Sequence, residues 1–273
     1  MKSKKKYFYP RLSDKDFGFF RLGGPGLANC MFFAAKAYIA CKIYNGVYIS
    51  PTWKKFSIGP YIRHEKDKRA YTSLFKNYGL SGLKKVIAIL GSKLYPSKYT
   101  IVSELGDYFT DIQLYQSVIK QYFENIVNPE TIKQVPDSIA NNVAIHVRLG
   151  DYLPHLRVPI NWYVNIVKEI LKINPNQDFV LFSDGRDEEL LDLLKIPNVR
   201  KVFFGNAFAD MWAISKCKLL IASDSTFSAW GAFLGNVPII FNKRHFPPVY
   251  DTRGAEFVLG DSTKIPTELI PLL

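Results

Sequence analysis

The chain has 273 residues, 48% of them hydrophobic and 15% aromatic, which is enough for two domains with real cores and excludes extensive disorder. No apolar run approaches the ~20 residues of a membrane-spanning helix, and the basic start leads into aromatic residues rather than the apolar region of a signal peptide. Three cysteines without a Cys-x-x-Cys pair suggest reduced thiols, so we expect a cytoplasmic protein.

The net charge of +12 belongs entirely to the first half of the chain. Residues 1–140 carry 22 lysines and arginines against 10 acidic residues, whereas residues 141–273 carry 14 of each. A basic half favours a nucleic acid, an anionic membrane or an acidic substrate as its partner. A solvated basic surface that aids solubility is the simpler explanation.

The residue pattern of the first half predicts an α/β layer with irregular segments between its elements. Residues 17–22 predict a strand, the glycine-rich loop 23–26 follows, and an apolar helix runs from residue 27 to about residue 43. Residues 47–50 predict another strand. Turn-forming residues are frequent between positions 128 and 142, which places the domain boundary there. We set it between residues 138 and 139.

The second half alternates strands and helices. Strands are predicted at residues 143–147, 179–182, 199–204, 219–222 and 237–241, and helices at residues 160–171, 187–194, 210–217 and 226–234. This alternation predicts a mostly parallel sheet with helices on both faces. Such sheets bind ligands beyond the carboxyl ends of their strands, so the residues that follow each strand are the candidates for chemistry.

A charged cluster follows the strand at residues 143–147. His146 and Arg148 alternate in strand register and can share one face, and Asp151 comes three residues later. The planar fork of an arginine matches phosphate oxygens, so Arg148 could clamp a diphosphate. An Arg148–Asp151 ion pair beside a buried histidine is the structural alternative.

Four other segments have weaker signals. The loop at residues 23–29 permits close backbone approach to a ligand, and residues 222–231 lead from a strand into a helix that Ser225 or Thr226 can cap. Asp210 is expected at a helix start, and residues 182–185 form an acidic turn after a strand. An ordinary turn or cap explains each one alone. No metal-binding motif is present, so no metal is expected.

Together these segments resemble glycosyltransferase family 11, the α-1,2-fucosyltransferases. Residues 146–152 are similar to the family motif His-Val-Arg-Arg-Gly-Asp-Tyr, and residues 210–232 resemble a second signature that ends in Ser-Asn-Ser-Thr-Phe-Ser-Trp-Trp-Gly-Ala. Residues 182–184 match its Phe-Ser-Asp element, and residues 26–32 resemble its Gly-Leu-Gly-Asn-Gln-Met-Phe loop. The matches keep the family's order from about residue 20 to residue 240.

The resemblance implies an α/β fold of the GT-B-like type, with two Rossmann-type domains and mostly parallel sheets. Residues 1–138 would form the basic acceptor-side domain, and residues 139–273 the domain that binds the nucleotide-sugar donor. It implies inverting transfer of fucose from GDP-fucose to a glycan acceptor, with no cofactor and no essential metal. The residues that would bind the donor are Gly26, Asn29, His146, Arg148, Ser183, Asp184, Asp210, Ser225, Thr226 and Phe227.

The chain departs from the family pattern in ways that concern the donor. Leu149 replaces the second arginine of the first motif, which removes a positive charge, and Asp224 replaces an asparagine and adds a negative one. Ala28 and Cys30 replace glycine and glutamine in the N-terminal loop. These changes weaken the inference of an α-1,2 linkage and leave open another nucleotide sugar.

Inverting transfer requires stabilisation of the departing diphosphate and deprotonation of the acceptor hydroxyl. We assign Arg148 the first task and favour Asp151 or His155 as the base, with Glu104, Asp107 and a base-free mechanism as alternatives. The resemblance also suggests lipid-linked acceptors and peripheral contact with an anionic membrane at its inner face. A basic RNA-binding protein is the non-enzymatic alternative, but no RNA-binding module is recognisable and no nucleic acid is expected.

Overall fold

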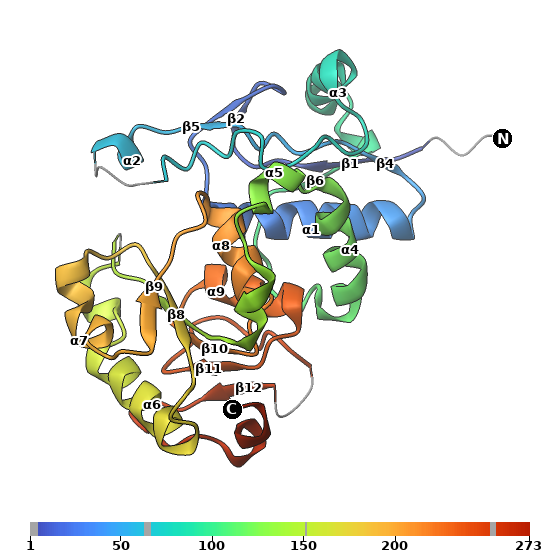
Figure 1. Ribbon diagram of the computed structural model, residues 1–273. Helices are drawn as coiled ribbons and strands as arrows, with labels where there is room; N and C mark the ends of the chain where they lie inside the picture. The colour runs from blue at the N-terminus through green and yellow to red at the C-terminus, as the bar shows by residue number, and fades with distance from the viewer. Residues whose placement is uncertain (1–4, 63–66, 151, 252–254) are drawn as a thin grey trace. The chain divides into compact units, whose positions relative to one another are not determined.

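The computed structural model describes residues 5–62, 67–150, 152–251 and 255–273 (Figure 1). The chain divides into two compact units, Met1–Ile132 and Lys133–Leu273. The division falls inside the turn-rich segment 128–142, a few residues before the expected boundary. Among the described residues, Cys30, Cys41 and Cys217 are free thiols.

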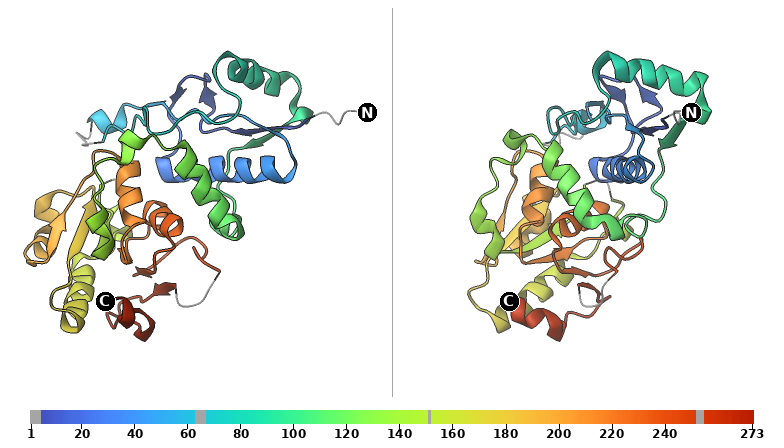
Figure 2. Two further views of the ribbon diagram at one scale, coloured as in Figure 1. Left: turned by 45° about the vertical axis from the view of Figure 1, so that its right-hand side comes forward. Right: turned by 90° about the vertical axis from the view of Figure 1, so that its right-hand side faces the viewer.

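The N-terminal unit combines a parallel sheet with helices on both of its faces. Its strands are β1 (Tyr7–Pro10), β2 (Lys15–Asp16), β3 (Arg21–Leu22), β4 (Val47–Tyr48), β5 (Lys55–Phe56) and β6 (Tyr99–Val102), and its helices are α1 (Leu27–Ile43), α2 (Gly59–Ile62), α3 (Gly82–Leu94), α4 (Gln116–Ile126) and α5 (Pro129–Ile132). Strands β4, β1 and β6 form a parallel sheet in that order. Helices α1 and α3 lie on its opposite faces (Figures 1 and 2).

The predicted strand at residues 17–22 is wrong for most of its length. Gly18 has a φ of 84° and the Phe17 amide bonds the Phe20 carbonyl, so the chain turns there and only Arg21–Leu22 is a strand. That strand belongs to a small sheet with β2 and β5. The central strand of the larger sheet is β1, which sequence analysis did not identify. Helix α1 has the predicted ends, Leu27 and Ile43.

The C-terminal unit is built on one six-stranded sheet. Its strands are β7 (Val143–Val147), β8 (Phe179–Ser183), β9 (Val199–Lys201), β10 (Leu219–Ala222), β11 (Ile239–Phe241) and β12 (Glu256–Val258), and its helices are α6 (Ile160–Ile173), α7 (Leu191–Leu194), α8 (Ala207–Ile214) and α9 (Thr226–Gly235). The order is β12-β11-β10-β7-β8-β9, and every pair is parallel. The predicted parallel sheet is therefore confirmed.

Strand β7 occupies the centre of this sheet. The chain continues from β7 to β8 and β9 on one side, and then returns to place β10 on the other side. His146 of β7 consequently faces Phe182 of β8 and Ala222 of β10 across the sheet. Ligands bind where the strand order reverses in this way, outside the carboxyl ends of the strands.

The predicted elements of this unit are largely confirmed, and the differences have local causes. Strands β7 and β10 have the predicted ends. Helix α8 begins three residues early, because the side chain of Asn206 accepts a hydrogen bond from the Ala209 amide and caps the helix there. Strand β9 stops at Lys201, before the predicted end at Phe204. Within the described ranges, no helix combines the length and apolarity required to cross a bilayer.

Candidate functional site

His146, near the end of β7, is tied to the start of α9. Its side chain is buried, and its Nδ1 atom lies 2.9 Å from the hydroxyl oxygen of Ser223 and 2.6 Å from that of Ser228. Its ring stacks on Phe227 with 5.1 Å between the ring centroids. The two predicted site residues His146 and Phe227 therefore meet. Ser223 and Ser228 lie inside the segment 222–231, and the sequence pattern indicated no role for them.

The pKa of His146 is lowered from 6.5 to about 3, chiefly by burial and also by the nearby Arg148, against the opposing effect of Asp184. The ring is therefore neutral near pH 7. It contributes hydrogen bonds and stacking rather than a positive charge beside Arg148.

This depressed pKa predicts a loss of stability in acid. Between pH 6.5 and pH 3 the unfolded chain binds a proton at His146 that the folded chain does not, so the free energy of unfolding falls as the pH falls through this window. The loss is ~1.4 kcal/mol per pH unit, or about 2 kcal/mol at pH 5. Denaturant titrations from pH 8 to pH 4 should show this slope reduced in His146→Gln. An unchanged slope in the variant would contradict the assignment.

Arg148 is held by Asp184, which follows the neighbouring strand β8. The guanidinium Nη1 lies 2.7 Å from Asp184 Oδ2, and both side chains are about one-fifth exposed, 21% and 23%. Asp184 Oδ1 accepts hydrogen bonds from the Leu149 amide at 2.9 Å and the Gly150 amide at 3.1 Å. One carboxylate thus fixes both the backbone after β7 and the arginine on it. The expected alternative partner, Asp151, lies outside the described residues.

Small residues permit this close packing of two loops. A Cβ on Gly150 would stand 2.6 Å from Asp184 Oδ2, and one on Gly185 would stand 2.5 Å from the Leu149 Cδ1 atom. Leu149 itself is buried in the core of the unit. At the position of the family's second arginine, this chain therefore has an apolar anchor for the loop.

The start of α9 offers amides beside this cluster. Ser225 is the N-cap residue, and its hydroxyl oxygen accepts a hydrogen bond from the Phe227 amide at 3.3 Å. The first turn of this ten-residue helix contains no acidic side chain. Thr226 and Phe227 occupy that turn and are partly exposed. Helix N-termini favour anions, so the predicted phosphate-binding residues lie at a suitable place.

Asp224 has a partner that the sequence did not indicate. Its Oδ1 accepts hydrogen bonds from the backbone amide of His245 at 2.9 Å and lies 2.6 Å from that residue's Nδ1. The Asp224 carboxylate, which replaces a family asparagine, therefore binds the loop after β11 rather than standing alone. Tyr152 donates a hydrogen bond from its hydroxyl to the Asp224 carbonyl at 2.8 Å.

Two other predicted donor-binding residues make local contacts with the backbone. Asp210, in the first turn of α8, accepts a hydrogen bond from the Phe204 amide at 2.8 Å. Ser183 accepts one from the Gly185 amide at 3.0 Å through its hydroxyl oxygen. These contacts order the loops after β8 and β9, and direct contact of either residue with a donor stays a prediction.

The candidate bases are exposed where they are described. His155 lies on a short 3-10 turn, Pro154–Leu156, and its side chain is exposed. Glu104 and Asp107 are exposed in the N-terminal unit. Among the described residues, no group of three or more His, Cys, Asp or Glu side chains is arranged to hold a metal ion. The expected metal independence stays a prediction.

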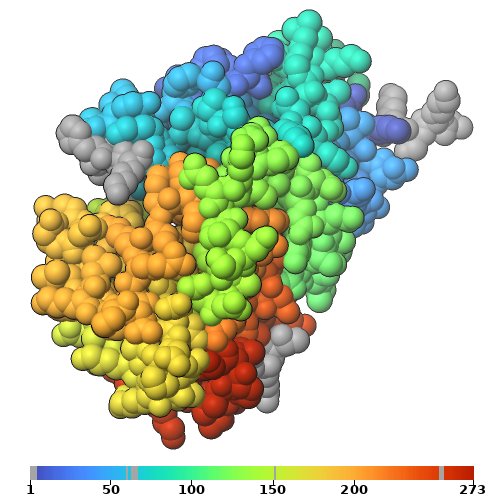
Figure 3. Space-filling model, viewed as in Figure 1, coloured from blue at the N-terminus to red at the C-terminus, as the bar shows by residue number. Residues whose placement is uncertain are grey.

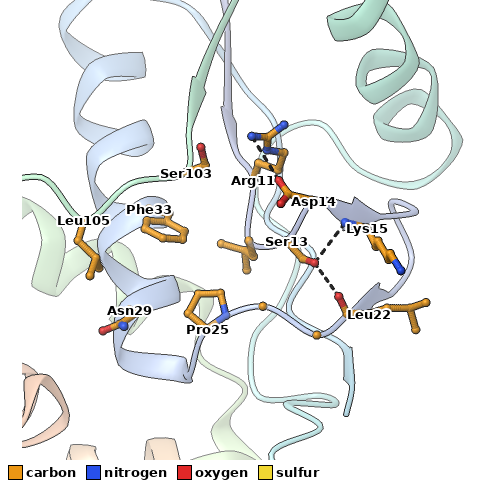
Figure 4. A pocket seen from close by; sticks show the side chains of 13 residues that line it. Arg11, Ser13, Asp14, Lys15, Leu22, Pro25, Asn29, Phe33, Ser103 and Leu105 are labelled. Carbon is orange, nitrogen blue, oxygen red and sulfur yellow. Dashed lines mark hydrogen bonds and ion pairs between the residues drawn. The ribbon is translucent and has the colours of Figure 1, made fainter.

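Asn29 lines a hollow in the N-terminal unit, and Gly26 directly follows Pro25, another lining residue. Gly26 precedes the first residue of α1, and Asn29 lies in its first turn. The hollow measures about 680 Å³, and Figure 4 shows Asn29 and Phe33 of α1 on one side and Ser13 and Leu22 on the other.

Two buried cations support the glycine-rich loop at this hollow. Lys55 Nζ donates to the Gly24 carbonyl at 3.0 Å, and the Arg21 guanidinium donates to the Gly23 carbonyl and to the Thr52 carbonyl. Arg21 is fully buried. The loop is therefore held by its carbonyl groups, in a backbone conformation that Gly24 adopts at a φ of 83°.

Comparison with known proteins finds a family model that matches about half of the chain. Residues 112–242 match the family model of glycosyl transferase family 11. Over 112 residues the chain is 31% identical to the O-antigen biosynthesis glycosyltransferase WbnK of Escherichia coli, and the alignment covers 37% of each protein. Over 134 residues it is 28% identical to the alpha-1,2-colitosyltransferase of Escherichia coli, covering 43% of this chain and 46% of that protein. The chain thus spans less than half the length of these relatives.

The fold has counterparts among solved structures. Fucosyltransferase NodZ from Bradyrhizobium superposes with a TM-score of 0.55 at 12% sequence identity, over 87% of this chain and 94% of that one. At this identity the likeness concerns the fold, and it confirms the GT-B-like α/β architecture expected from the sequence. The resemblance seen in the motifs is confirmed as a match: residues 112–242 are similar to the model of glycosyl transferase family 11.

Proposed function

We propose that this protein is an inverting, metal-independent glycosyltransferase that moves fucose from GDP-fucose to a galactoside hydroxyl in an α-1,2 linkage. The acceptor is a surface glycan or a lipid-linked oligosaccharide. Support comes from the family 11 region and from relatives named as glycosyltransferases. NodZ, which shares the fold, is named an alpha-1,6-fucosyltransferase, and one of its crystal structures was soaked with GDP-fucose.

One observation carries the proposal. Arg148 stands at the carboxyl end of the central strand, fixed by Asp184 at 2.7 Å, where the strand order of the sheet reverses. A rigid, permanently charged fork at this point suits the two phosphates of a nucleotide sugar. The amides at the start of α9 supply further positive potential there.

Arg148 stabilises the negative charge that develops on the departing GDP, and the α9 amides assist it. The neutral His146 ring positions Phe227 and the α9 start without taking up a proton. Asp151 or His155 accepts the proton of the acceptor hydroxyl. In the base-free alternative, departure of GDP drives the reaction and the proton leaves to water.

A different sugar is the second candidate, and two features favour it. Leu149 is a core residue here, so the family's second arginine has no substitute at that position. One relative is named an alpha-1,2-colitosyltransferase, which transfers a sugar other than fucose. Under this alternative Arg148 and α9 keep their roles, and only the sugar pocket differs.

A nucleotide panel tests the donor. We expect GDP to raise the unfolding temperature and UDP or dTDP to leave it unchanged, because stabilisation follows the ratio of ligand concentration to Kd and reaches about 2.7 kcal/mol at 100 times Kd. Donor hydrolysis and transfer should then occur with GDP-fucose in the presence of EDTA. Stabilisation by UDP alone would contradict the GDP assignment, and transfer only from another GDP-sugar would select the second candidate.

The site of action is also a proposal. We place the protein in the cytoplasm, peripherally at the inner face of the bacterial membrane, where the basic N-terminal unit would meet anionic lipid or an acceptor's pyrophosphate.

A further inference from the structure

Helix α3 presents an apolar stripe that its own unit leaves uncovered. Leu83, Ile87, Leu90 and Leu94 are 56–72% exposed. Their spacing of four, three and four residues places them along one side of a helix, over about 16 Å. Four large aliphatic side chains in one exposed row are unusual on a protein surface and indicate a partner.

The opposite side of α3 already packs in a small apolar cluster against the parallel sheet. Ala88 and Ile89 are buried and pack with Tyr9 and Ile49 of the parallel sheet. Helix α1 covers the other face of that sheet, and α3 forms the outer surface in all three views (Figures 1 and 2). Figure 3 shows the same helix at the upper edge of the unit. The exposed stripe is therefore not needed to hold α3 in place.

The charges around the stripe indicate the chemistry of the partner. Lys84 and Lys93 are exposed on α3, Lys98 is exposed just after it, and the helix contains no acidic residue. Tyr95, at the end of the helix, is 58% exposed. An apolar row flanked by lysines, with an aromatic side chain at its end, is the pattern of a helix that lies in a bilayer interface.

We propose that α3 docks on an anionic lipid bilayer, with Leu83, Ile87, Leu90 and Leu94 inserted among the acyl chains and the lysines at the headgroups. The excess of basic over acidic residues in the N-terminal half favours lipid over an uncharged protein surface. The inference specifies the membrane contact proposed above and is independent of sugar transfer, because vesicle binding needs neither donor nor acceptor.

Vesicle sedimentation of the full chain, without nucleotide, tests the proposal. We expect binding to phosphatidylcholine vesicles that contain about 30% phosphatidylglycerol, and much weaker binding to phosphatidylcholine alone. The double variant Ile87→Ser/Leu90→Ser should bind the anionic vesicles at least about tenfold more weakly, because it removes half of the inserted side chains. Leu114→Ser is the matched control, since Leu114 is 80% exposed in the same unit.

A fluorescent variant separates insertion from charge attraction. Leu90→Trp should shift its emission to shorter wavelength on anionic vesicles and keep the shift when salt is added after binding. Wild-type affinity in the double variant, no shift in Leu90→Trp, or no vesicle binding by the wild type would each overturn the proposal. So would self-association that the double variant abolishes without a change in vesicle binding. Circular dichroism spectra and unfolding temperatures that match the wild type show that the variants are folded.

Discussion

We expect Arg148→Ala to lower the rate of sugar transfer about 100-fold and to weaken GDP binding, because a preorganised donor to developing charge contributes ~3 kcal/mol in the transition state. Arg148→Lys should recover only part of the rate, since an ammonium keeps the charge but cannot bind two phosphate oxygens in the plane of a fork. Steady-state kinetics with GDP-fucose and calorimetric GDP titration provide the two measurements.

The matched control for this change is Arg200→Ala. Arg200 is an exposed arginine of the same unit, in strand β9. Its removal alters the net charge equally but should leave the transfer rate and the GDP affinity near wild type. If Arg148→Ala keeps both quantities while remaining folded, the diphosphate is bound elsewhere and the proposed site is wrong.

The central strands could be predicted because both faces of the sheet are covered. Every residue of β7 and β10 is buried, which produces the continuous apolar runs at residues 143–147 and 219–222. Strand β1 gives no such signal: it is only four residues long and follows a run of lysines. Its central position depends on pairing with β4 and β6, which are distant in sequence.

The same distinction applies to the candidate site. Arg148 and the cap of α9 could be located from strand ends alone, because the carboxyl edge of a parallel sheet collects such residues. The partners of these residues depend on strand order and loop course. Asp184 reaches Arg148 because β8 is the neighbour of β7, and His245 reaches Asp224 because the loop after β11 returns to β10. The sequence pattern alone does not predict either of these two contacts.

Asp184 is expected to act as a positioning residue whose loss costs nearly as much as the loss of Arg148. Its carboxylate accepts two backbone amide hydrogen bonds and pairs with the guanidinium, so Asp184→Ala leaves the loop and the arginine without their common anchor. We expect kcat to fall about 100-fold, because small displacements of a catalytic group have effects of this size. Asp184→Asn retains an oxygen that can accept the amide hydrogen bonds, so its kcat should fall only about tenfold.

A double-mutant cycle distinguishes positioning from general destabilisation. If Asp184 acts through Arg148, then Arg148→Ala/Asp184→Asn should be no slower than Arg148→Ala alone, because the arginine that Asp184 orients is already absent. If the double variant is instead slower by the product of the two single losses of rate, then Asp184 touches the donor itself or only supports the fold. Asp187→Asn serves as the control, since the Asp187 side chain is 72% exposed at the start of the short 3-10 helix that follows this loop. Its kinetics should match those of the wild type.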